Sequence, residues 1–260
     1  MKLSLMTYGL GQELSLDEIL GILSRQGFAG VEFRVDHGQK HGVEPELSAS
    51  QRDTVKARCA EAGIAVVSIA SGNRFHQQDP AEVQKNTARA RQVIELAADL
   101  GAPLVRVFGN NFPEGVDREV VMRQVADCLN ELGDFARPLG VDVDLEMHGE
   151  FCWREALHTV ELADHPCVGL IFNSDPRDVE HGSIAHVFDA AGHRIRHIHM
   201  HHLTAADFPC EELLRVLVER GYDGYLSAEI TAPESVSETL LGYYARLFRA
   251  YAALAKGTAS

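Results

Sequence analysis

Short apolar or alternating segments recur along the chain, and each is followed by a longer segment whose apolar residues have helical spacing. Alternation with a period of two predicts a β-strand, and apolar residues three and four positions apart predict a helix. The predicted strands are residues 3–8, 30–34, 64–70, 104–108, 141–148, 168–172, 195–200 and 225–229. The predicted helices, counted with their caps, are residues 15–26, 48–62, 79–100, 117–137, 154–163, 183–190, 210–220 and 235–255.

Capping signals mark several of the predicted helix ends. Ser15 is followed three residues later by Glu18, which is the pattern of a capping box, and Gly27 ends the same helix. Asp79 precedes Pro80, a residue that favours the first position of a helix. Two further capping pairs are Ser48 with Gln51 and Ser235 with Glu238.

The order of the predicted elements is a strand and then a helix, repeated eight times without a linker or a break in composition. Strands that alternate with helices predict a parallel sheet, and eight such units suggest closure into a (β/α)₈ TIM barrel. Residues 1–260 are therefore expected to form a single α/β domain, with residues 257–260 as a short flexible tail. A doubly wound open sheet is the alternative, but no G-x-G-x-x-G sequence follows the first strand to mark its ligand site.

The formal net charge of −14 restricts the expected partners. Nucleic acids and anionic membrane surfaces are bound by Lys/Arg patches, so this acidic chain is expected to bind neither. The five cysteines form no C-x-x-C pair, which indicates reduced thiols rather than disulfides or a zinc site. The sequence shows no signal peptide and no apolar run long enough to cross a membrane, so a cytoplasmic protein is expected.

The predicted strand 141–148 ends on a carboxylate and an imidazole. Glu146 and His148 are two positions apart and therefore share one face at the C-terminal end of the strand. Such a pair is either part of a metal or acid–base site or a polar pair at the rim of the fold. In a (β/α)₈ barrel the active site lies at the C-terminal ends of the strands, so the neighbouring strand ends decide between these interpretations.

Four consecutive strands each place a polar residue at this end, about one strand–helix unit apart. They are Glu146, Asn173, His199 and Glu229. Two carboxylates, one amide oxygen and one imidazole suit a divalent ion such as Mn²⁺, Mg²⁺ or Co²⁺. Zinc is less expected, and structural zinc is disfavoured because no cysteine joins the set. His197, His199 and His201 alternate on one strand, so only one can lie at the height of the metal, and His197 is expected to be a satisfied core histidine.

Six more residues at or after strand ends are candidates for substrate binding. They are Arg34, His41, His76, Asn110, His148 and His201. Each has a structural alternative: Arg34 could form an ion pair with a barrel carboxylate, His41 could be a solvated loop residue, and Asn110 could be a turn former. Arg106, if it points inward, must pair with a carboxylate such as Glu32.

Five stretches of the chain resemble the xylose-isomerase-like superfamily of sugar phosphate isomerases and epimerases. They are residues 27–34, 145–149, 168–173, 195–199 and 221–229. The resemblance implies a metal-dependent barrel whose ligands are Glu, Asp, His and Glu from the last four strands. Asn173 stands where the family usually has Asp, and Pro176 stands where it often has His. Asp175 is therefore an alternative ligand.

The resemblance to ketose epimerases also implies a mechanism. The metal would chelate a carbonyl oxygen and a neighbouring hydroxyl, while Glu146 and Glu229 would remove and return a proton on the adjacent carbon. The loops after the seventh and eighth predicted strands are not the Gly-rich loops that bind phosphate in such barrels. A non-phosphorylated sugar, keto-sugar, cyclitol or glycoside is therefore the expected substrate of an isomerase or epimerase.

Three other functions remain open from the sequence. A dehydratase or lyase would begin with the same proton abstraction at the same site. A non-catalytic sugar-binding barrel would have a degraded metal site, and Asn173 is the feature that favours it. Apurinic-site endonucleases share this barrel but need a basic surface, which the charge of −14 does not favour. Family members are often dimers or tetramers, so a homo-oligomer is a further possibility.

Overall fold

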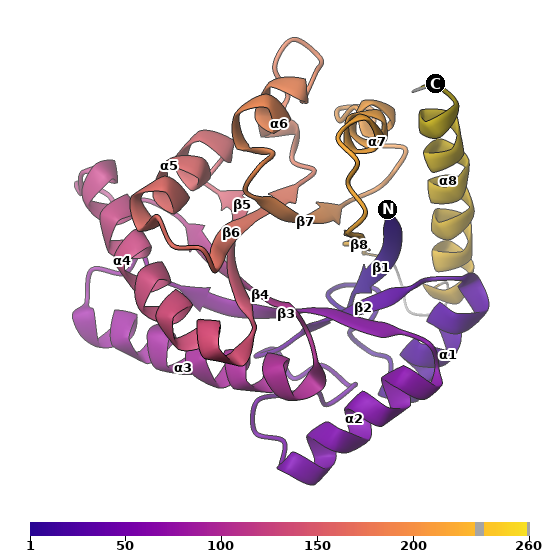
Figure 1. Cartoon of the computed structure of the whole chain (residues 1–260), viewed down its shortest axis with the longest axis horizontal. Coiled ribbons are helices and arrows are strands. Elements are labelled where there is room, and N and C mark those ends of the chain that lie inside the picture. The colour runs from indigo at the N-terminus through magenta and orange to yellow at the C-terminus, as the bar shows by residue number, and fades with distance from the viewer. Residues whose placement is uncertain (232–236, 259–260) are drawn as a thin grey trace.

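Eight parallel strands close into one barrel, and each strand is followed by a helix on the outside (Figure 1). The computed structural model describes residues 1–231 and 237–258. Each strand pairs with the next one in sequence, and β8 pairs with β1. The prediction of a single (β/α)₈ TIM barrel is therefore confirmed, and the doubly wound alternative is excluded.

The strands are β1 (Lys2–Met6), β2 (Gly30–Arg34), β3 (Ala65–Arg74), β4 (Leu104–Asn110), β5 (Asp142–Gly149), β6 (Val168–Asn173), β7 (Ile195–Met200) and β8 (Tyr225–Ala228). The helices are α1 (Leu16–Gln26), α2 (Ala49–Glu61), α3 (Pro80–Leu100), α4 (Arg118–Ala136), α5 (Trp153–Ala163), α6 (Ala185–Ala191), α7 (Cys210–Glu219) and α8 (Ser237–Thr258). Two short 3₁₀ helices, η1 (Arg137–Leu139) and η2 (Pro176–Asp178), follow α4 and β6. Among the described residues, no helix is both long and apolar enough to cross a membrane.

The capping signals read from the sequence set the helix starts. Ser15 and Glu18 form the predicted capping box, and Gly27 ends α1 in the left-handed conformation at φ 74°. The Asp79 side chain accepts a hydrogen bond from the backbone N–H of Ala81, with Pro80 at the first position of α3. Two predictions at the C-terminal end fall partly or wholly outside the described residues, namely the cap at Ser235 and the tail at 257–260. Helix α8 continues to Thr258, beyond its predicted end at residue 255.

Two strands are longer than the sequence predicted, because a glycine in each marks close packing rather than the end of the strand. Strand β3 continues past Gly72, where an added Cβ would lie 3.3 Å from Nη2 of Arg34. Strand β4 continues past Gly109, where an added Cβ would lie 2.3 Å from the ring of Phe151. Both extensions carry a register shift, so the strand ends bend as they reach the mouth of the barrel.

The interior of the barrel is unusually polar, whereas the outward faces of the strands form the hydrophobic core with the helices. On β5, Leu145 and Met147 are buried in the core cluster, while Glu146 between them is also buried but points the other way. The polar side chains that are buried on the strands include Glu32, Arg106, Asp144, Glu146, His197 and His199. This alternation places ionisable groups from several strands in one enclosed space.

Candidate metal centre and active site

The four residues predicted as metal ligands meet inside the C-terminal half of the barrel. Nδ1 of His199 lies 2.9 Å from Oε1 of Glu146 and 3.5 Å from Oε2 of Glu229. Ligand atoms of Glu146, His199 and Glu229 all lie within 4.8 Å of one another. Asn173 joins them, because its Nδ2 donates a hydrogen bond of 2.7 Å to Oε1 of Glu146.

The hydrogen bonds around this group leave two acceptors without a partner. Oδ1 of Asn173 and Oε2 of Glu229 are buried and have no hydrogen-bond donor in the described structure. A buried acceptor that stays unsatisfied costs free energy, so each such atom calls for an explanation. A cation bound between Asn173, His199 and the two glutamates would satisfy both atoms. The residues present therefore fit a divalent metal ion with mainly oxygen ligands.

Arg106 compensates one charge of the centre. Its Nη1 lies 2.8 Å from Oε2 of Glu146, and both side chains are almost fully buried. Arg106 thus points inward and pairs with a carboxylate, as predicted, but the partner is Glu146 rather than Glu32, because β4 lies next to β5. Burial by itself raises the pKa of Glu146, but Arg106 and His199 outweigh it and hold that pKa below its usual range.

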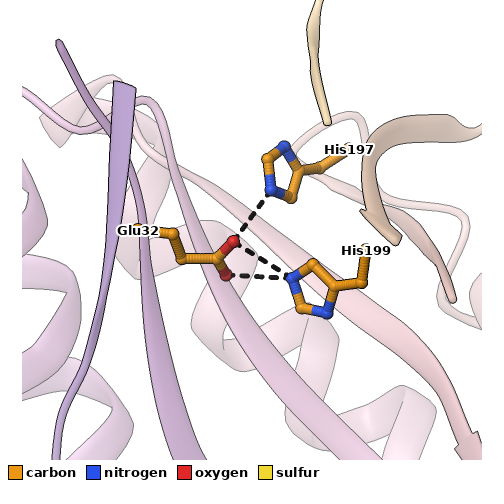
Figure 2. Close-up of side chains that lie close together, drawn as sticks. All are labelled: Glu32, His197 and His199. Carbon is orange, nitrogen blue, oxygen red and sulfur yellow. Dashed lines mark hydrogen bonds and ion pairs between the residues drawn. The ribbon is translucent and has the colours of Figure 1, made fainter. Parts of the chain in front are cut away.

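Glu32 is a member of the site that was not predicted from the sequence. Figure 2 shows that it points from β2 toward both His197 and His199 of β7. Both of its oxygens lie 3.1 Å from Nε2 of His199, and one lies 2.9 Å from Nε2 of His197. The same nitrogen of His197 is 2.9 Å from Oγ of Ser227, so His197 is a satisfied core histidine, as predicted. The signal that could have found Glu32 is its position two residues before Arg34, on the same inward face.

Glu32 and His199 each stabilise the charged form of the other. Burial alone would raise the pKa of Glu32, but His199 and His197 hold it well below its ordinary value. Burial alone would lower the pKa of His199, but Glu32 and Glu146 hold it well above its ordinary value. An enclosed polar network of this kind is stable only because every charge has a partner of opposite sign.

Asp175, the alternative ligand, lies outside this group. Oδ1 of its carboxylate accepts hydrogen bonds of 2.9 Å from the backbone N–H and from Nε of Arg177. None of the described clusters that could hold a metal ion includes Asp175. The structure therefore brings Asn173, and not Asp175, to the centre.

Three of the predicted substrate-binding residues lie at the mouth beside the centre. Nε2 of His201 is 3.6 Å from Oε2 of Glu229, and this contact raises the pKa of His201. Nδ1 of His148 is 3.2 Å from Oδ1 of Asn110, and the His148 ring packs 4.8 Å from the ring of Phe108. Asn110 has φ 73°, a left-handed conformation that Asn tolerates better than most residues. His148 and His201 each follow a proposed ligand by two residues, Glu146 and His199, and so lie nearer the mouth.

Arg34 is the last residue of β2 and is almost fully buried. Its Nη1 donates hydrogen bonds of 2.9 Å to the carbonyl oxygens of Val35 and Ala70, and its Nη2 contacts His37. No carboxylate of the described residues lies within 4.0 Å of it, so the alternative of an ion pair is not realised. Burial lowers the pKa of Arg34 to about 9.

The remaining two candidates have different environments. Both ring nitrogens of His41 are used inside the chain, with Oγ1 of Thr7 at 3.1 Å and the backbone N–H of Val43 at 3.0 Å. His41 is buried and ties the segments after β1 and β2 together, so the structure does not support a substrate contact. His76 is half-buried, and its Nδ1 has no hydrogen-bond partner among the described residues.

Comparison with known proteins agrees with this architecture. A family model described as the xylose isomerase-like TIM barrel matches residues 20–247. The chain belongs to this family. The resemblance seen in the sequence is therefore confirmed.

Two curated relatives have assigned activities. Fructoselysine 3-epimerase of Shigella flexneri is 22% identical over 251 residues, which cover 88% of this chain and 90% of the relative. The 3-dehydroshikimate dehydratase of Pseudomonas putida is 28% identical over 167 residues, which cover 62% of this chain but 24% of that protein. The relatives therefore include an epimerase that matches over nearly its whole length and a dehydratase that matches over a part.

Two solved structures share the fold over almost the whole chain. An L-ribulose 3-epimerase superposes with a TM-score of 0.81 at 18% identity and covers 99% of this chain and 96% of its own. The IolI protein with a bound zinc atom superposes with a TM-score of 0.75 at 19% identity and covers 100% and 98% of the two chains.

Proposed function

We propose that this chain is a metal-dependent isomerase or epimerase that acts on a non-phosphorylated sugar, keto-sugar or cyclitol. The observation that carries the proposal is the convergence of Glu146, Asn173, His199 and Glu229, with two buried oxygens left without a donor. The epimerases among the relatives and the similar structures support the same class of reaction.

The four converging residues would hold one divalent ion, and their oxygen-rich set favours Mn²⁺, Mg²⁺ or Co²⁺ over zinc. Such an ion, when bound, polarises the substrate carbonyl and makes the neighbouring C–H bond more acidic. Glu229 is the more accessible carboxylate, with a side-chain exposure of 18% against 1% for Glu146. Glu229 would remove the proton next to the carbonyl, and Glu146 on the other side would complete the acid–base pair.

Polar groups at the mouth would orient the substrate. His148 and His201 are partly exposed beside the two glutamates, and both can hydrogen-bond to hydroxyl groups. Arg34 and Asn110 are the last residues of β2 and β4, at the same end of the barrel. The acidic charge of the chain supports an uncharged substrate rather than a phosphorylated one or a nucleic acid. Five free cysteines support a reducing, cytoplasmic setting.

Two measurements test the proposal. Elemental analysis of the purified protein should find about one divalent ion per chain, and Glu146→Gln should lose it, because that substitution removes a charged ligand. NMR should detect deuterium from D₂O entering a member of a panel of keto-sugars and cyclitols beside its carbonyl. The absence of metal under every loading condition would refute the proposal, and metal without exchange would favour a non-catalytic sugar-binding protein.

A dehydratase or lyase is the second candidate, and the match to a 3-dehydroshikimate dehydratase favours it. Both reactions begin when a base removes a proton beside a carbonyl, so deuterium exchange alone does not separate them. Mass spectrometry of the product does: an isomer or epimer keeps the substrate mass, whereas dehydration removes the mass of one water molecule.

A further inference from the structure

We infer that Glu32 is the positioning residue of the metal centre, because it fixes the orientation and the tautomer of His199. The inference rests on the proposed function, since it concerns how one ligand of the proposed ion is presented. Glu32 does not belong to the group of four ligands, and its side-chain hydrogen bonds to described residues go to His197 and His199. It acts on the centre only through the ring of His199 (Figure 2).

The two nitrogens of His199 face different partners. Nε2 lies 3.1 Å from each oxygen of Glu32, whereas Nδ1 faces Glu146 at 2.9 Å and Glu229 at 3.5 Å. A neutral imidazole carries one N–H donor and one acceptor nitrogen, and an ionised carboxylate can only accept. With an ion between the ligands, Nε2 therefore donates to Glu32, and Nδ1 offers its lone pair to the ion. A histidine ligand whose other nitrogen donates to a carboxylate is held in one orientation and becomes a stronger ligand.

Glu32 is itself held rigidly, which a positioning residue needs to be. Its side chain is fully buried on β2, and it reaches across the barrel to β7. Nε2 of His197 lies 2.9 Å from Oε2 of Glu32 and 2.9 Å from Oγ of Ser227. The Ser227 hydroxyl is in turn 2.9 Å from the hydroxyl of Ser4 on β1. A chain of hydrogen bonds through β7, β8 and β1 thus holds the carboxylate of β2 that faces His199.

A second ion between Glu32, His197 and His199 is the competing interpretation, because their ligand atoms also lie within 4.8 Å of one another. The separations of 2.9 to 3.1 Å are those of direct hydrogen bonds, and all the nitrogen and oxygen atoms involved have partners. The hydrogen bonds already account for this cluster, so the structure assigns it to orientation rather than to metal binding. The two interpretations differ in the number of ions bound per chain.

The test compares Glu32→Gln with Glu212→Gln in the full-length protein. Glu212 is the matched control: both of its oxygens also accept hydrogen bonds, from Oγ of Ser183 at 2.7 Å and the backbone N–H of Ile184 at 2.9 Å, but it lies on α7 outside the barrel. After metal removal, each protein is titrated with Mn²⁺, and the Kd and stoichiometry are measured by EPR of the free ion. We expect Glu32→Gln to raise the Kd about 10- to 100-fold, the usual effect of losing such a partner, and Glu212→Gln to leave it unchanged.

A second readout follows the tautomer itself. Nitrogen-15 NMR of labelled histidine in a diamagnetic complex with Mg²⁺ should show the proton of His199 on Nε2 in the wild type, and a different nitrogen shift in Glu32→Gln. If Glu32→Gln does not fold, His197→Gln removes one anchor of Glu32 and should raise the Kd by a smaller factor.

The outcomes separate the inference from the function on which it rests. A wild-type protein that binds no ion contradicts the proposed function. One ion bound equally well by wild type and Glu32→Gln overturns the role of Glu32 alone. Two ions in the wild type and one in Glu32→Gln overturn it in favour of a second metal site.

Discussion

Replacing Asn173 with Asp tests the proposed ligand that differs from the Asp that the family resemblance implies. In the metal-free protein, Nδ2 of Asn173 donates to Oε1 of Glu146 at 2.7 Å. The Asp variant loses this hydrogen bond to a charged group, which contributes about 1.5–3 kcal/mol. It also sets a second carboxylate against Glu146, where the repulsion of two charges 4 Å apart is about 4 kcal/mol at an effective dielectric constant of 20.

The variant can avoid most of this repulsion by protonating one of the two carboxyl groups. We therefore expect a net loss of about 3 kcal/mol for the metal-free protein, which lowers the melting temperature by about 6 °C for a chain of this size. With Mn²⁺ the sign reverses, because the new carboxylate ligates the ion. The Kd should fall by at least about tenfold, equivalent to about 1.4 kcal/mol.

The assay is thermal unfolding by circular dichroism in EDTA and in excess Mn²⁺, combined with titration of the metal-free protein. Asn111→Asp is the control, because it makes the same chemical change at an exposed position near the mouth. Equal stability of wild type and Asn173→Asp in EDTA, together with an unchanged Kd, would show that Asn173 is not part of the centre. A higher Kd for Asn173→Asp than for the wild type would contradict the argument that the added carboxylate strengthens metal binding.

Two further predictions concern buried groups around the site. Arg106→Gln should lower the free energy of unfolding by about 3 kcal/mol at pH 7, because it removes the arginine partner of the buried Glu146 and leaves only His199 to balance that charge. Urea unfolding measures this change, and a loss below about 1 kcal/mol would contradict it. Burial lowers the pKa of His41 from 6.5 to about 4, so only the unfolded chain takes up this proton between those pH values. Stability should therefore fall as the pH drops through this window, by up to about 1.4 kcal/mol per pH unit, and His41→Gln should remove that part of the pH dependence in urea unfolding.

The fold could be predicted from the sequence because its signals are local. Alternation along each strand, helical spacing and caps such as Ser15 with Glu18 depend only on residues a few positions apart. Eight repeats of a strand followed by a helix are compatible with only a few fold topologies. The extensions of β3 and β4 were missed because Gly72 and Gly109 look like strand ends in sequence, whereas their role depends on Arg34 and Phe151 from other elements.

The candidate site could be predicted from the sequence only in part, because some of its contacts join residues that are far apart in the chain. The four proposed ligands lie at or just after the C-terminal ends of four consecutive strands, so a barrel alone places them together. The pairing of Glu32 with His199 joins β2 to β7 across the barrel, and that pairing depends on side-chain length and barrel shape rather than on spacing. The hydrogen bonds of His41 could not be predicted, because nothing in its own loop shows that Thr7 comes within hydrogen-bond distance.

The two glutamates of the proposed acid–base pair have different surroundings, and their variants should differ accordingly. Glu146 accepts short hydrogen bonds from Arg106 and Asn173, whereas Oε2 of Glu229 has no hydrogen-bond donor among the described residues. A carboxylate can take up a substrate proton only if the substrate reaches it, and the Glu229 side chain is 18% exposed against 1% for Glu146.

Glu229→Gln should therefore abolish deuterium exchange while the free energy of unfolding falls by no more than about 1 kcal/mol, because the side chain is partly exposed and its contacts with His199 and His201 are long, at 3.5 and 3.6 Å. Glu146→Gln should also abolish exchange, and in addition its free energy of unfolding should fall by about 3–5 kcal/mol, because the substitution leaves Arg106 buried without its ion pair. Urea unfolding and exchange are measured on both variants under the same conditions. A destabilisation of the same size in both would show that Glu229 is held as firmly as Glu146, and the assignment of Glu229 as the carboxylate that removes the proton would then be wrong.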